Sequence, residues 1–96
     1  MELTIFARFS AREGRESDVE AALRAQVPSA RREPGCLAIA AYRSPRNPRL
    51  FWIHSRWKDE AAFEVHAELP QTQRFVAKME QLTDHPFDAT RAELIA

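Results

Sequence analysis

The stretch EPGCLAIAAYRSPRNPRLFWIHSRWKDEAAFEVHAELP, from Glu33 to Pro70, decides the fold of this chain. It opens on a Pro-Gly turn and continues as two apolar runs, 36–43 and 50–57, of a length typical of β-strands. The segment between the runs holds two prolines and one asparagine, which predicts a hairpin loop. Asp59 is placed to cap a following helix. Pro70 breaks that helix and starts another, because its ring removes a backbone donor.

The segments outside this stretch add a strand and a helix before it and a strand after it. Leu3 to Phe9 alternates residues between two faces and predicts the first strand. Residues 17–20, Ser-Asp-Val-Glu, match the capping box, so a helix is expected to begin with Ser17 as its cap. Pro28 should kink or restart that helix. Phe87 to Ile95 alternates again and predicts the last strand.

The resulting order of elements predicts one domain, residues 1–96, of the α+β class with the ferredoxin-like split β-α-β-β-α-β arrangement and an antiparallel sheet. Both apolar runs of the hairpin are apolar on both of their faces; in the first, Leu37 and Ile39 alternate with Cys36 and Ala38. Helices would cover one sheet face and leave an apolar second face. We expect a second copy of the chain to cover it, giving a homodimer through the sheet face.

Composition argues against several classes of function. The 14 basic and 14 acidic side chains balance, so no field attracts nucleic acid or an anionic membrane. The single Cys36 excludes an internal disulfide and fits a reducing, cytoplasmic compartment. Two glycines cannot build a phosphate loop, and no histidine spacing predicts a metal site. The apolar run Leu3 to Ala7 is too short for a membrane span or a signal-peptide core.

Two faces of the predicted structure bring candidate site residues together. Alternation places four residues of the second hairpin strand on one sheet face, and residues three apart share one face of the next helix. Because the strand leads directly into the helix, these faces should meet around one cavity. The predicted strand residues are Phe51, Ile53, Ser55 and Trp57, and the predicted helix residues are Phe63 and His66.

Each of the polar or aromatic candidates also has a purely structural interpretation. His66 is either a core histidine whose nitrogens bond the backbone or a titratable group in a cavity, poised near neutral pH. Trp57 is either a large core side chain or a cavity wall with an indole donor. Ser55 on an apolar face must bond the backbone or line a cavity, because an unpaired buried hydroxyl is costly. Cys36 is expected to be an inert small core residue.

Three segments together resemble the antibiotic biosynthesis monooxygenase family of small dimeric α/β-barrel proteins, which includes quinol monooxygenase-like members. They are Glu33 to Leu37, Arg49 to Ala62 with its Arg-Trp-Lys-Asp-Glu core, and His66 with Leu69-Pro70. The resemblance covers nearly the whole chain. It implies a monooxygenase that uses molecular oxygen on a small electron-rich aromatic substrate, quinol or polyphenol-like, without metal, flavin or haem. Trp57 would then wall the cavity and His66 would be its basic member.

Two positions depart from the family pattern and keep other functions open. Ser55 stands where many relatives have a glutamate, and Gln71 stands where many have a histidine after the proline. These replacements favour a non-catalytic dimer that binds a small molecule. A third interpretation is an isomerase of a small phosphorylated metabolite that uses the same cavity, with Arg8 and Arg43 as candidate phosphate ligands.

Overall fold

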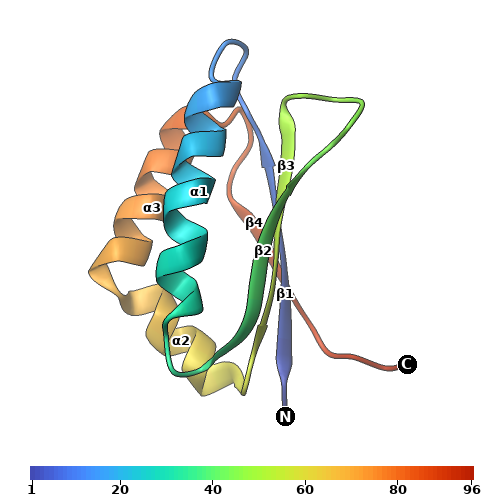
Figure 1. Cartoon of the computed structure of the whole chain (residues 1–96), viewed down its shortest axis with the longest axis vertical. Helices are drawn as coiled ribbons and strands as arrows, with labels where there is room; N and C mark the ends of the chain where they lie inside the picture. Colours follow the sequence, from blue (N-terminus) through green and yellow to red (C-terminus); the bar gives the residue numbers. More distant parts are fainter.

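Four antiparallel strands form one layer of the molecule (Figure 1). Their order in the hydrogen-bonded sheet is β2-β3-β1-β4. The computed structural model describes the whole chain, residues 1–96. The ferredoxin-like α+β arrangement predicted from the sequence is confirmed. In chain order the elements are β1 (Leu3–Ser10), α1 (Glu16–Arg31), β2 (Cys36–Arg43), β3 (Leu50–Trp57), α2 (Glu60–Glu68), α3 (Pro70–Leu82) and β4 (Asp88–Ala92).

All three helices lie on the same face of the sheet, and the opposite face carries no helix (Figure 1). The core lies between the two layers, where β1 and β3 pair with Ala7 opposite Ile53 and Phe9 opposite Phe51. These side chains are buried against Val19 and other apolar residues of α1 and α3. Burying each large apolar side chain contributes about 1.5–3 kcal/mol, so this contact positions the helices over the sheet.

Helix α1 differs from the sequence prediction at both ends. The helix begins at Glu16, and the N-cap position before it is Arg15, whose side chain makes no capping hydrogen bond. The predicted Ser17 cap is therefore wrong. The carboxylate of Glu16 instead accepts a bond from the backbone N–H of Gly14 at 3.1 Å. The predicted restart at Pro28 is also wrong, because the helix continues to Arg31. Pro28 lies in the last turns and loses only one backbone bond there, while its neighbour Val27 stays buried.

The hairpin strands keep their predicted bounds, but a β-bulge changes the facing of one residue. The register shifts between Cys36 and Ala38, so Leu37 is an extra residue opposite the Trp57–Arg56 step. Cys36 therefore lies on the helix side with Ile39 and packs against the core, not on the opposite face as simple alternation predicts. The last strand is shorter than predicted and ends at Ala92.

The helical segment after β3 follows the prediction closely. Asp59 accepts a bond from the backbone N–H of Ala62 at 2.8 Å and caps α2. Helix α2 ends at Glu68, and Pro70 occupies the first position of α3, where a missing N–H costs nothing. None of the three helices is both long and apolar enough to cross a membrane.

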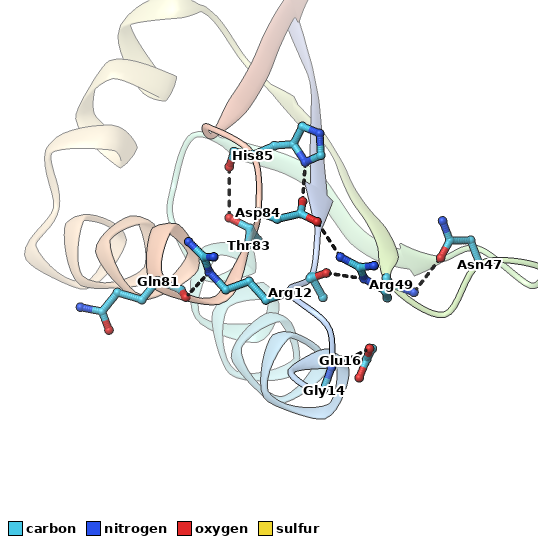
Figure 2. Close-up of polar contacts among 10 residues, drawn as sticks. Arg12, Gly14, Glu16, Asn47, Arg49, Gln81, Thr83, Asp84 and His85 are labelled. Atoms are coloured by element: carbon cyan, nitrogen blue, oxygen red, sulfur yellow. Dashed lines mark hydrogen bonds and ion pairs between the residues drawn. The ribbon is translucent and has the colours of Figure 1, made fainter.

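A polar cluster ties three loops together at the end of the sheet where Ser10 pairs with Leu50 (Figure 2). Arg49 donates from Nε to the carbonyl of Ala11 at 2.7 Å and from Nη2 to Asp84 at 2.6 Å. Asp84 also bonds the exposed His85, and this bond lowers the pKa of the Asp84 carboxyl. Trp57 lies at the other end of β3, so this cluster stabilises the scaffold away from the predicted site.

Candidate functional site

A cavity of about 110 Å³ lies between the sheet and the helices. Ten of its 14 lining residues are hydrophobic, and they come from every strand and helix or from the segment before β4. Such an apolar hollow with few polar groups is the usual form of a small-molecule site. The polar residues on its wall are Gln26 of α1, Ser55 of β3, His66 of α2 and Thr72 of α3.

His66 is buried and is held by a carboxylate from a distant part of the chain. Its Nδ1 lies 3.0 Å from both carboxylate oxygens of Glu33, and Thr72 Oγ1 lies 3.5 Å from the same nitrogen. An ionised carboxylate can only accept, so Nδ1 carries the hydrogen and donates it to Glu33. In the neutral ring Nε2 then holds the lone pair. This is the tautomer that a general base needs.

The Pro-Gly turn brings Glu33 to His66 by packing directly on α2. A Cβ added to Gly35 would lie 2.4 Å from Cβ of Ala62, so no other residue fits without movement. The carbonyl of Gly35 accepts a bond from the backbone N–H of Lys58 at 3.0 Å, which ties the turn to the start of α2. Close packing of the turn therefore positions the carboxylate against the imidazole.

Trp57 stacks behind His66. Its ring centroid lies 4.5 Å from that of the imidazole, with 33° between the planes, and Phe63 packs at 5.8 Å. The indole Nε1 donates to Ser55 Oγ at 3.0 Å, which satisfies both buried groups. Trp57 is 1% exposed and is not among the cavity-lining residues, so the expectation that it walls the cavity is corrected. The indole therefore packs against one face of the imidazole and helps to fix its orientation.

Phe51 is the other candidate that does not reach the cavity wall. It belongs to the main core cluster and is 2% exposed. Alternation predicts the sheet face of Phe51 correctly but does not give its distance from the cavity. Phe51 lies six residues before Trp57, which corresponds to about 20 Å along the strand. Ile53, Ser55, Phe63 and His66 do line the cavity.

Three polar residues near the cavity were missed by the sequence reasoning. The sequence around Glu33 predicts a turn and contains no signal for its pairing with His66. Gln26 falls on the apolar stripe of α1 with Leu23 and Val27, so its position was a usable signal. Thr72 likewise shares a face with Phe75 of α3. No group of three or more His, Cys, Asp or Glu side chains is arranged to hold a metal ion.

The model of the family described as "Antibiotic biosynthesis monooxygenase" matches residues 3–78, which contain Glu33, His66 and most of the cavity wall. The chain belongs to the antibiotic biosynthesis monooxygenase family. Among curated proteins, the chain is similar to "Putative monooxygenase YcnE" of Bacillus subtilis (strain 168), with 35% identity over 68 residues. That match covers 71% of this chain and 72% of the relative.

Solved structures have the same fold over almost the full chain. Rv0793 from Mycobacterium tuberculosis superposes with a TM-score of 0.93 at 23% identity, covering 100% of this chain and 97% of that one. PA3566 from Pseudomonas aeruginosa superposes with a TM-score of 0.91 at 29% identity, covering 99% of this chain and 95% of that one. The α+β fold of this antibiotic biosynthesis monooxygenase family member is therefore shared by experimentally solved proteins.

Proposed function

We propose that this chain is a monooxygenase that oxidises a small, electron-rich aromatic substrate of the quinol or polyphenol type with molecular oxygen. Membership of the family and the name of the Bacillus subtilis relative support a monooxygenase-like role. One observation supports the assignment of the reaction to this site. The buried imidazole of His66 is oriented by Glu33 and lies on the wall of an apolar cavity.

In the proposed reaction His66 Nε2 takes the proton of a ring hydroxyl. Glu33 and the face of Trp57 stabilise the imidazolium that forms. The resulting anion is the reductant for oxygen, so the substrate supplies the electrons itself. One oxygen atom bonds to a ring carbon, and the other leaves as water with two substrate hydrogens. A quinol thereby becomes a hydroxylated quinone.

The size of the cavity limits the substrate to one ring. A cavity of about 150 Å³ holds a benzene molecule, and this one is about 110 Å³ before any ligand enters. Phe63 and Val76 on its wall are only partly buried, so we expect their side chains to give way to a substituted ring. The apolar wall would keep water from the reactive anion, and water exclusion strengthens the interaction between substrate and imidazole.

Oxygen uptake with a panel of one-ring quinols tests the proposal. We expect stoichiometric uptake and, with labelled dioxygen, one labelled atom in the product by mass spectrometry. The variant His66→Gln is the matched control, because its amide still donates to Glu33 but cannot act as a base. Uptake that is unchanged in this variant would contradict the role of His66. No uptake with any quinol would contradict the reaction.

A non-catalytic, ligand-binding dimer is the second candidate. It is favoured by one observation: His66 is the only titratable side chain on the cavity wall, so no second acid or base is available there. A stoichiometric co-purified aromatic molecule, together with absent oxygen uptake, would support it. The isomerase interpretation is weaker, because neither Arg8 nor Arg43 lines the cavity; Arg43 pairs with Glu20 instead.

A further inference from the structure

Gln26 is a buried amide on the apolar side of α1. It is 7% exposed and lies between Leu23 and Val27, both of them core residues. Glutamine is mostly exposed in proteins, so its burial here requires an explanation. The residue lies on the wall of the cavity that also contains His66.

The amide of Gln26 is not satisfied within the chain. The side-chain hydrogen bonds of the cavity region join His66 with Glu33 and Thr72, and Ser55 with Trp57, but none involves Gln26. No fully enclosed side-chain nitrogen or oxygen lacks a partner. The amide of Gln26 must therefore remain accessible to a small molecule. A ligand that enters the cavity displaces any water at this amide, so the ligand must offer a polar group in return if binding is to be favourable.

We propose that Gln26 is a ligand-recognition residue, whose amide bonds a hydroxyl or carbonyl substituent of the molecule that occupies the cavity. The amide offers both a donor and an acceptor, which suits a hydroxyl or a carbonyl. His66 Nε2 offers a second, separate acceptor from α2. The Gln26 amide and His66 Nε2 are therefore two separate hydrogen-bonding groups in a cavity that holds one ring. Such a cavity should prefer a ring with two polar substituents to a ring with one or none.

This inference rests on the proposed function only in using the same cavity. It adds the residue that binds the second hydroxyl of the one-ring, dihydroxy substrate already proposed. It requires binding but no turnover. Its failure and the failure of the monooxygenase proposal can therefore be observed separately.

Gln26→Leu separates a binding role from a structural one. Leucine has similar size and helix preference but no polar atoms. If the amide serves the ligand, the ligand-free variant should have a melting temperature no lower than that of wild type, because no hydrogen bond within the chain has been removed. If the amide were structural, the melting temperature would fall. Gln81→Leu is the matched control, because that side chain is exposed on α3.

The binding experiment compares three probes, toluene, phenol and a dihydroxybenzene, by calorimetry without oxygen. Wild type should bind the dihydroxybenzene most tightly and toluene least. Gln26→Leu should weaken dihydroxybenzene binding by about tenfold and leave toluene binding unchanged, and Gln81→Leu should change neither. Gln26→Met is the second variant if leucine prevents folding.

Three results would overturn the proposal: an equal affinity of wild type for all probes, no measurable binding of any probe, or an unchanged preference in the Gln26 variants. Gln26-dependent binding without oxygen uptake would instead keep the proposal and remove the monooxygenase reaction.

Discussion

At the scale of single residues, the proposed base depends on a neighbour that the chain supplies from far away. The imidazole of His66 has two equivalent-looking nitrogens, and only the carboxylate of Glu33 makes them different. The carboxylate accepts from Nδ1 and leaves Nε2 free, so the pair works as one unit. In a buried histidine without such a partner, either ring nitrogen could carry the hydrogen. The Glu33–His66 pair fixes Nε2 as the nitrogen that can accept a proton.

The first prediction concerns this pair. We expect His66→Ala to lower kcat on a quinol substrate by about 100- to 10,000-fold, the range for a lost general base. Its free energy of unfolding should fall by only about 1–3 kcal/mol, because the buried carboxylate loses its partner. Steady-state kinetics, with chemical denaturation in parallel, provide the measurement.

Glu33→Gln tests the carboxylate independently. The amide can bond Nδ1 in either tautomer and carries no charge, so we expect kcat to fall by about 10- to 100-fold with little change in KM. Parallel losses of stability and turnover in His66→Ala and Glu33→Gln would leave only a packing role for the pair.

The reactivity of the Cys36 thiol provides a test of the charge on Glu33 that does not depend on the proposed reaction. Burial raises the pKa of the Cys36 thiol, and the nearby Glu33 carboxylate raises it further. A raised pKa means less thiolate at a given pH, and the thiolate is the form that reacts. We expect iodoacetamide to modify Cys36 more slowly in the native protein than in the unfolded chain at pH 8. Glu33→Gln should speed the native reaction, and Cys36→Ser provides the blank. An unchanged rate in Glu33→Gln would contradict the electrostatic coupling.

At the scale of elements, the site depends on how closely the turn after α1 approaches α2. Gly35 lets the turn touch Ala62, and this contact brings Glu33 within bonding distance of His66. The Asp59 cap and the Pro70 break keep α2 short and set where it begins and ends. The contact between turn and helix is therefore as important to the site as the helix itself.

Gly35→Ala tests this contact. The added methyl group would lie 2.4 Å from Ala62 Cβ, so we expect the free energy of unfolding to fall by about 1–3 kcal/mol or more. Ala62→Gly alone should cost about 1 kcal/mol through lower helix propensity. The double variant Gly35→Ala/Ala62→Gly should lose less free energy of unfolding than the two single variants lose in sum. The reason is that glycine at position 62 leaves room for the methyl group at position 35. Strictly additive effects in urea denaturation would show that the two residues do not press on each other.

At the scale of the whole molecule, the sheet has one covered and one open face (Figure 1). The open face carries Phe6 and Tyr42, each about half exposed, and a groove of about 840 Å³ that includes Phe6, His54 and Leu94. Apolar patches of this kind in soluble proteins usually mark an interaction site. A second copy of the chain is the partner that we propose, because closed two-fold dimers are the commonest assembly.

The corresponding prediction is a homodimer with twice the 11.0 kDa chain mass in sedimentation at micromolar concentration. Phe6→Asp should shift the mass toward the monomer, because it would bury an unpaired charge in the interface. Val65→Asp is the matched control: Val65 is also an exposed apolar residue, but it lies on α2 on the other side of the sheet. A monomeric wild type, or equal dissociation by both variants, would refute an interface on the open sheet face.

The sequence by itself determined the features that depend on neighbours along the chain. The hairpin, the Asp59 cap and the break at Pro70 follow from residues within one or two turns of each other, and the structure has all three. Alternation also assigned Ile53 and Ser55 to the cavity face. At Ser17 and Pro28 the local signals favoured a cap and a break, but the burial of the apolar side of α1 outweighed both.

Only the tertiary structure decided what surrounds the cavity. Glu33 and His66 are 33 residues apart, and no local rule pairs them. The bulge at Leu37 reverses the facing of Cys36, and the depth of Phe51 in the core removes it from the wall. The absence of a hydrogen-bond partner for the Gln26 side chain within the chain also appears only when all its neighbours are known. The physical reason is the same in each case: burial, hydrogen-bond partners and close packing are relations between distant segments, which short-range patterns do not contain.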